Sequence, residues 1–138
     1  MATGCGFQEI LTLLDKPKIS GSKDVYELFH HLSDCQYEEF WIVFLNKANR
    51  VIARQKISEG DISGTVVDLR RIFHHTLNIL GTELILIHNH PSGNIHPSDA
   101  DITITKKIVD AGKLFDIAIL DHLIIAAGYY SFADNGMI

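Results

Sequence analysis

Cysteine is scarce in this sequence, and long apolar runs are missing from it. The two cysteines, Cys5 and Cys35, form no C-x-x-C pattern, so they supply neither a disulfide framework nor a cysteine-rich zinc site. No apolar run approaches the roughly 20 residues that cross a bilayer, and the N-terminus lacks the basic start and apolar core of a secretory signal. These absences predict a cytoplasmic protein that does not act at a membrane.

Positive charge is sparse as well. The 138 residues include 12 Lys and Arg against 17 Asp and Glu, which gives a formal net charge of −5, and basic residues never cluster beyond a pair. Duplex nucleic acid binding draws most of its affinity from cationic contacts to phosphates. The charge therefore makes direct DNA binding by this domain doubtful, whereas DNA work carried out by a partner or a neighbouring domain stays open.

Apolar periodicity predicts an alternation of helices and strands. Helical patterns cover 24–32, 68–80 and 98–112, and strand patterns cover 40–45, 50–57, 82–88, 117–120, 122–127 and 129–132. This alternation is that of an α/β or α+β sandwich, in which helices cover the faces of a mixed sheet. We interpret residues 1–18 as a lead-in left from an upstream region and residues 19–138 as one compact domain.

Several polar and small residues are expected to mark the ends of these elements. Ser22 is expected to cap the first helix. In the second helix the apolar stripe includes Leu77 and Leu80, and Gly81 is expected to end it. Asp121 is expected to separate the strand pattern of 117–120 from that of 122–127.

The chemistry is expected in the segment that follows the strand over 82–88. Residues two apart on an extended chain point the same way, so His88 and His90 can offer both imidazoles to one point. Pro91 keeps the backbone extended at His90, and the loop turns through Gly93 toward a helix whose first turn holds Asp101. Two imidazoles and one carboxylate suit Zn²⁺ and leave a fourth position open, which is the arrangement of a catalytic site.

Each part of this segment also has a purely structural interpretation. Ser98-x-x-Asp101 matches a capping box, in which Asp101 reaches back to the Ser98 amide. His88 alone, at the end of a strand, is typical of a packed core histidine. The joint occurrence of H-x-H-P, the glycine turn and S-x-x-D at this spacing favours the metal site over both alternatives.

The same residues carry a family resemblance. The run H-x-H-P-x6-S-x2-D resembles the JAMM motif of the JAB/MPN superfamily of metalloenzymes, with Asn89 where Ser or Thr is common. Three segments are similar to the RadC branch of that superfamily: H-N-H-P-S-G at 88–93, P-S-x-x-D at 97–101 and L-D-H at 120–122. The segment 37–46 resembles the family's strand with an E-x-F-W start. The likeness extends from about Ile19 to Phe132.

The resemblance implies a three-layer, cytidine-deaminase-like α/β sandwich with one Zn²⁺ and hydrolase chemistry of the metallopeptidase type. Carried over residue by residue, the zinc ligands are His88, His90 and Asp101. Ser98 would help to hold the developing oxyanion, and Glu38 would be the acid/base carboxylate.

Three further residues are candidates for supporting roles. Glu39 is the fallback for Glu38; neighbouring residues of a strand face opposite sides, and alignment to E-x-F-W selects Glu38. Asn89 and His122 are candidates for contacts just behind the ligands, although His122 fits a core histidine equally well.

Three functions remain open at this point. The first is a hydrolase of peptide or isopeptide-like amides in a protein substrate, and the second is a DNA repair or recombination factor that binds without cutting. The third is a silent scaffold with a structural zinc. A nucleobase deaminase is disfavoured because H-x-E with P-C-x-x-C is missing, and H-E-x-x-H is missing too. The strand pattern over 129–132 is a candidate edge for pairing with a second copy of the chain.

Overall fold

The computed structural model describes residues 9–10, 16–60 and 67–138. Cys5 and most of the predicted lead-in over 1–18 lie outside these residues. Within the described part of the chain, no helix is both long enough and apolar enough to cross a membrane.

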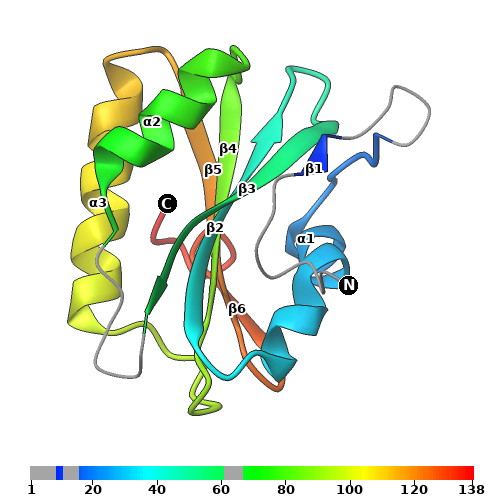
Figure 1. Ribbon diagram of the computed structural model, residues 1–138, viewed down its shortest axis with the longest axis vertical. Helices are drawn as coiled ribbons and strands as arrows, with labels where there is room; N and C mark the ends of the chain where they lie inside the picture. The colour runs from blue at the N-terminus through cyan, green and yellow to red at the C-terminus, as the bar shows by residue number, and fades with distance from the viewer. Residues whose placement is uncertain (1–8, 11–15, 61–66) are drawn as a thin grey trace.

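A six-stranded mixed sheet forms the middle layer of the molecule (Figure 1). Its strands, in their order across the sheet, are β1 (Glu9–Ile10), β3 (Val51–Gly60), β2 (Glu38–Leu45), β4 (Glu83–Asn89), β5 (Ala118–Ile125) and β6 (Tyr129–Ser131). The neighbours β4 and β5 run parallel, and the other neighbouring pairs are antiparallel. A parallel pair needs a long crossover, which a helix between β4 and β5 supplies.

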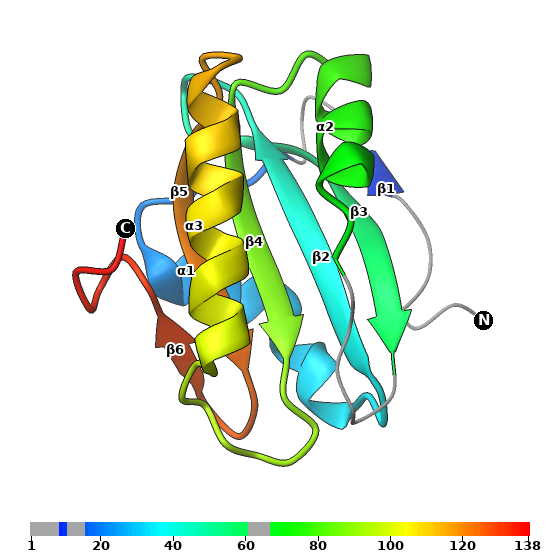
Figure 2. The same ribbon diagram turned by 90° about the vertical axis from the view of Figure 1, so that its left-hand side faces the viewer.

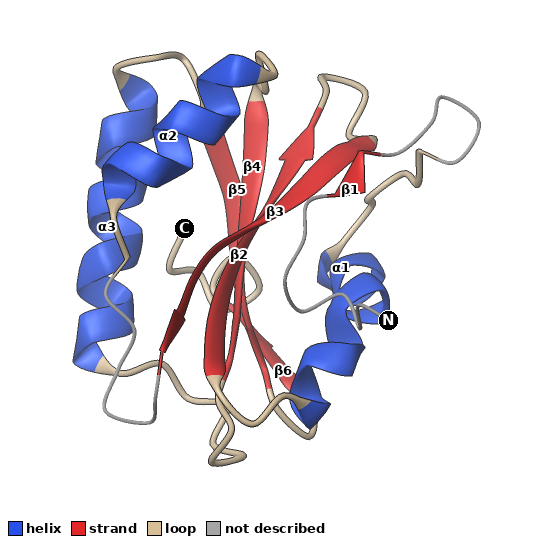
Figure 3. Ribbon diagram, in the orientation of Figure 1, coloured by secondary structure: helices blue, strands red, loops and turns tan. Residues whose placement is uncertain are grey.

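Helices cover both faces of this sheet (Figures 2 and 3). One face carries α1 (Ser22–Phe29) and the short 3₁₀ helix η2 (His30–Asp34), and the other carries α2 (Leu69–Asn78) and α3 (Asp99–Lys113). The predicted three-layer α/β sandwich with a mixed sheet is therefore confirmed.

The central strands are buried on both faces because their side chains alternate between two apolar cores. Trp41 and Val43 of β2 belong to the core under α1, whereas Phe40 and Ile42 belong to the core under α2 and α3. The same alternation in β4 sends Leu84 and Leu86 to the α2–α3 side. The next residue in that register is His88, so the strand itself aims this imidazole toward α3.

Two of the expected element boundaries are wrong because tertiary hydrogen bonds take over the polar side chains. Ser22 lies inside α1 and does not cap it; its hydroxyl lies 3.1 Å from the Tyr129 hydroxyl and donates to Asp134. Strand β5 continues through Asp121, although its register with β4 shifts just before this residue, between Ile119 and Asp121. The Asp121 carboxylate accepts from the Ser131 hydroxyl and from the backbone amide of Ala133. A buried carboxylate with these partners can remain within a strand.

The end of α2 also differs from expectation. The helix ends at Asn78, and Leu80 rather than Gly81 adopts the left-handed conformation, with φ at +53°. The stripe prediction is wrong for the last turn, since Leu77 is 45% exposed and Leu80 is 80% exposed. Leu77 lies within the helix but outside its buried face, which carries Ile72, Phe73 and Thr76, and Leu80 lies beyond the helix end.

We expect Leu80→Gly to raise the free energy of unfolding by up to about 1 kcal/mol, because glycine removes the cost of a left-handed backbone at a residue with a Cβ. Denaturant unfolding measures the change. The matched control is Leu114→Gly, at a residue that is 84% exposed but right-handed, with φ at −68°. This control should lower the free energy of unfolding by about 0.5–1 kcal/mol. An equal loss in both variants would contradict the prediction.

Candidate metal centre

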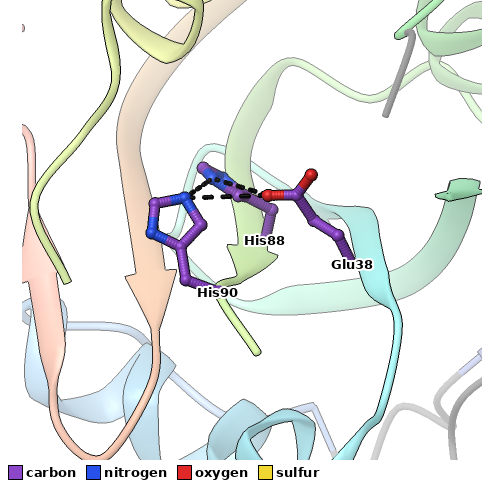
Figure 4. Close-up of side chains that lie close together, drawn as sticks. All are labelled: Glu38, His88 and His90. Atoms are coloured by element: carbon purple, nitrogen blue, oxygen red, sulfur yellow. Dashed lines mark hydrogen bonds and ion pairs between the residues drawn. The ribbon is translucent and has the colours of Figure 1, made fainter. Parts of the chain in front are cut away.

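The register between β2 and β4 brings two distant parts of the sequence together. Phe40 pairs with His88 across these antiparallel strands. Glu38 lies two residues before Phe40 at the start of β2, and His90 lies two residues after His88, just past the end of β4. The period of two places both on the same side of the sheet as Phe40 and His88. Figure 4 shows the side chains of Glu38, His88 and His90 pointing toward one another.

Four side chains converge on one point at this end of the sheet. The two Nε2 atoms of His88 and His90 lie 2.9 Å apart. From the first turn of α3, Asp101 places Oδ1 3.3 Å from the first of these nitrogens and Oδ2 3.2 Å from the second. The Oε1 atom of Glu38 lies 4.0 Å and 3.7 Å from the same two nitrogens. The structure therefore brings together Glu38, His88, His90 and Asp101, which are four of the five residues that the family resemblance assigns to a ligand or catalytic role.

The donor set suits a divalent metal ion. Nδ1 of His90 lies 2.6 Å from the Asn94 carbonyl oxygen, which only accepts, so this nitrogen carries a hydrogen, and in the neutral ring Nε2 is left with the lone pair that a metal ion needs. One ligand atom from each of Glu38, His88 and His90 lies within 4.8 Å of the others. Imidazole nitrogens and carboxylate oxygens are ligands that Zn²⁺ takes in proteins.

Asp101 serves the helix end and the histidines at once. Its Oδ2 accepts from the Ser98 amide at 2.8 Å, and the Ser98 hydroxyl oxygen accepts from the Asp101 amide at 3.1 Å, which completes a capping box. The two interpretations that the sequence left as rivals are thus both present. The Ser98 hydroxyl lies on the exposed helix end and keeps its own hydrogen for donation. Its role toward an oxyanion stays a prediction.

The charges of this group depend on one another. Burial by itself would raise the pKa of Asp101, but hydrogen bonds from His88 and His90 hold that pKa well below its ordinary value. Burial would likewise lower the pKa of His90, but its bonds to Asp101 and to the Asn94 carbonyl raise that pKa overall. A positive charge between the imidazoles and the carboxylate is therefore favourable, and either a proton or a metal ion can supply it.

The neighbouring carboxylate faces the other side of the sheet. Glu39 is 3% exposed; its Oε1 accepts from the Trp41 indole at 2.9 Å, and its Oε2 lies 3.7 Å from the Lys56 ammonium. This carboxylate is thus held in the core under α1, away from the histidines. Of the two glutamates that the sequence offered, Glu38 is the one beside His88 and His90.

Asn89 fixes the backbone on both sides of Glu38. Its Oδ1 accepts from the Glu39 amide at 2.7 Å, and its Nδ2 donates to the Tyr37 carbonyl at 2.9 Å. The buried amide side chain therefore extends the β2–β4 ladder past its last backbone pair. Asn89 thus acts on the backbone that carries Glu38, and its expected role as a contact behind the metal ligands stays a prediction.

His122 contacts the back of His88. It is fully buried, its Nε2 lies 2.7 Å from Nδ1 of His88, and its Nδ1 lies 2.6 Å from the Thr105 hydroxyl. Its ring also stacks on Phe132, with 4.7 Å between centroids. His122 was interpreted either as a core residue or as a contact behind a metal ligand. In the structure it is a buried core residue that also contacts His88. Burial, followed by the charge of His88, lowers the pKa of His122 well below its ordinary value.

Thr105 is the contact that sequence reasoning missed. It follows Asp101 by four residues in α3, so both side chains lie on one face of that helix. This spacing was the available signal. The remaining histidines lie elsewhere: His30 and His31 in η2, His74 and His75 on α2, and exposed His96 in the loop before α3.

A pocket of about 210 Å³ opens beside the converging groups. Its polar side consists of Glu38, His88 and Asp101. Its apolar lining consists of Phe40, Val67, Ala100 and Ile104.

We expect the metal-free protein to lose stability as the pH rises above 6.5, the ordinary pKa of histidine. Because the pKa of His90 is raised on folding, its stabilisation is complete below that value and is lost as the pH passes through the folded pKa. Thermal midpoints in a chelator measure the slope, and His90→Gln should remove it. Three other histidines, His31, His75 and His122, have lowered pKa values. They change the stability only below pH 6.5 and so do not contribute to the slope above it. A thermal midpoint that increases as the pH is raised beyond 6.5 would contradict the prediction.

Asn89→Ala should lower the free energy of unfolding by about 1–3 kcal/mol, since it leaves the buried Glu39 amide without its partner. Chemical denaturation measures the loss. Asn46→Ala is the matched control because Asn46 Oδ1 also accepts from two backbone amides, those of Ala48 and Arg50, but at an exposed turn. The control should cost less, and equal losses would show that Asn89 acts only as a turn-type hydrogen-bond partner.

Comparison with known proteins identifies the family. A family model described as a RadC-like JAB domain matches residues 19–137. A UPF0758 protein of Flavobacterium johnsoniae is 48% identical over 127 residues, which are 91% of this chain and 56% of that relative. The UPF0758 proteins of Pelobacter propionicus and Methanosarcina mazei are 34% and 37% identical and match 100% and 92% of this chain, over 65% and 57% of their own lengths. The chain thus spans only part of the length of these curated relatives. It belongs to the RadC-like JAB domain family, as the resemblance predicted.

Proposed function

We propose that this chain is a zinc-dependent hydrolase that cleaves peptide or isopeptide-like amide bonds. The observation that carries the proposal is the convergence of two imidazoles and two carboxylates at the side of a pocket. Membership of the RadC-like JAB family supports it, because the JAMM-type residues of this sequence are the residues that converge.

We assign His88, His90 and Asp101 as the zinc ligands and Glu38 as the acid/base. The Asp101 oxygens lie 3.2–3.3 Å from the imidazole nitrogens, whereas the Glu38 oxygen stands back at 3.7–4.0 Å. A carboxylate that stands back from the ligands leaves room for a water molecule between itself and them. The Glu38 oxygen also lies close enough to both imidazole nitrogens to share a metal ion with them. Experiment therefore has to decide which of the two carboxylates is the metal ligand and which is the acid/base.

The protein groups around the metal position have distinct tasks. When bound, zinc lowers the pKa of water to about 7 and so makes a hydroxide nucleophile available near neutral pH. Glu38 accepts a proton at Oε1 and returns it to the leaving amine. Ser98 donates its hydroxyl hydrogen to the oxygen that gains negative charge. Phe40 and Ile104 form an apolar wall that keeps bulk water from these groups.

The substrate class follows from charge and from the pocket. The pocket lining suits an uncharged side chain next to the bond that is cut. A net charge of −5 favours a peptide or protein substrate over duplex DNA. DNA repair by binding stays the alternative function that the family resemblance suggests. Pairing of two copies through the sheet edge at β6 stays a prediction from the strand pattern.

Two conservative substitutions separate the ligand from the acid/base. Asp101→Asn should lower zinc affinity more than about 100-fold, whereas Glu38→Gln should keep stoichiometric zinc and lower kcat for amide hydrolysis by about 10²–10⁴-fold. Metal analysis after dialysis and a panel of peptide and isopeptide substrates measure the two effects. The double variant His88→Ala with His90→Ala gives the reference for lost zinc.

Glu39→Gln is the matched control, since the same change is made one residue along the strand on the opposite face. It should keep both zinc and turnover. Loss of zinc in Glu38→Gln with retention in Asp101→Asn would exchange the two roles. Absence of bound zinc in the wild-type chain would refute the proposed function.

A further inference from the structure

A chain of short polar contacts runs from the back of His88 into α3. Nδ1 of His88 lies 2.7 Å from Nε2 of His122, and Nδ1 of His122 lies 2.6 Å from Oγ1 of Thr105. The Thr105 hydroxyl in turn donates to the backbone carbonyl of Asp101 at 2.6 Å. Since the Asp101 carboxylate faces His88 at 3.3 Å, the contacts close into a ring that joins two of the converging groups.

The chemistry of each atom sets the direction of the hydrogen bonds. A carbonyl oxygen only accepts, so Thr105 donates its single hydroxyl hydrogen to the Asp101 backbone carbonyl. Oγ1 of Thr105 can then only accept from Nδ1–H of His122. A neutral His122 then has a lone pair on Nε2, which accepts from Nδ1–H of His88. In the neutral form of His88, which is the form that binds a metal ion, Nε2 then has the lone pair, and this lone pair faces His90 and Asp101.

The surroundings of His122 keep it neutral. It is fully buried between aromatic rings, with Phe132 stacked at 4.7 Å and the Phe40 edge at 5.5 Å. A charged imidazolium is costly in such surroundings. Each of the two ring nitrogens has a partner, so the neutral ring is fully satisfied.

We propose that His122 and Thr105 are positioning residues that hold His88 in the Nδ1–H tautomer and thereby set the affinity of the centre for its metal. The inference rests on the proposed metal centre and goes beyond it, because neither residue would touch the metal or the substrate. His90 reaches the same tautomer by another route, through the Asn94 carbonyl oxygen. Both imidazoles then present Nε2 to the same point before any ion binds.

Thr105 and His122 could support the centre by packing rather than by hydrogen bonding, and matched substitutions distinguish these two roles. Thr105→Val and His122→Met keep volume and remove the hydrogen bonds. Thr105→Ser and His122→Gln do the opposite: they change the packing but keep an oxygen or nitrogen atom that can form a hydrogen bond. Competition of the full chain with a chromophoric chelator for Zn²⁺ gives the affinity, and the visible absorption of the Co²⁺ form reports the ligand geometry.

We expect Thr105→Val and His122→Met to weaken Zn²⁺ binding about 10- to 100-fold, which is the usual effect of removing a partner behind a ligand. Thr105→Ser and His122→Gln should bind nearly as the wild type does. Thr76→Val is the matched control, because Thr76 makes the same hydroxyl bond to the carbonyl four residues earlier, that of Ile72, but in α2. Its Zn²⁺ affinity should not change.

Nuclear magnetic resonance of ¹⁵N-labelled histidines in the zinc-loaded protein reads the tautomers directly. His88 and His122 should both carry their hydrogen on Nδ1. A hydrogen on Nε2 of His122 would overturn the inference. Equal losses in Thr105→Ser and Thr105→Val would also overturn it, because the methyl group rather than the hydroxyl would then matter. If the wild type binds zinc and all variants match it, this inference fails alone; if the wild type binds none, the proposed function fails with it.

Discussion

The pairing of Phe40 with His88 across β2 and β4 is the constraint on which the site depends. Side chains alternate along a strand, so a slip of one residue would turn every one of them to the other face. Such a slip on β2 would bring Glu39 in place of Glu38. The apolar residues that fix this register lie on both faces of the sheet, and the cores under α1 and under α2–α3 both oppose a slip. The positions of the polar groups are thus set by apolar packing some distance away.

The sheet also separates two carboxylates that are adjacent in the sequence. Glu39 is held among Trp41 and Lys56 on the α1 side, and Glu38 stands beside the histidines on the α3 side. The first is bonded by an indole and lies near an ammonium group, which are partners that hold a carboxylate in place. The second borders a pocket, where a carboxylate can exchange a proton with a molecule that enters. Identical side chains thus receive different surroundings from a strand's alternation.

Much of this arrangement could be predicted from the sequence, and the rest depends on tertiary contacts. Apolar periodicity predicts a mixed sheet with helices on its faces, and the family resemblance implies the three-layer form of that sandwich. The grouping of His88, His90 and Asp101 follows from a local run of fourteen residues at 88–101. Glu38 lies fifty residues earlier in the chain, so only the family resemblance could connect it to that run. Thr105 escaped notice because its four-residue spacing from Asp101 is common in helices and does not by itself indicate a contact with His122.

The wrong boundaries have a similar cause. Ser22 and Asp121 were interpreted by their local preferences, for a helix start and for a strand break. In the structure each is bonded to residues of the C-terminal segment, Asp134 and Ser131 among them. Such contacts outweigh local preference, and no window of sequence contains them. Leu80 is a different case, because its left-handed conformation is set by the end of α2 at Asn78 and not by a contact with a distant segment.

The capping box at the start of α3 has a consequence for the order of assembly. Asp101 is anchored to the Ser98 amide by the helix end itself, and His90 is anchored by a carbonyl of its own loop. The groups that would grip an ion are therefore set in place by the folded chain. Small zinc domains that fold only around their ion behave in the opposite way. Under the proposed function, a metal ion would therefore meet side chains that the helix end and the loop already hold in place, so its uptake and release would not require the chain to refold.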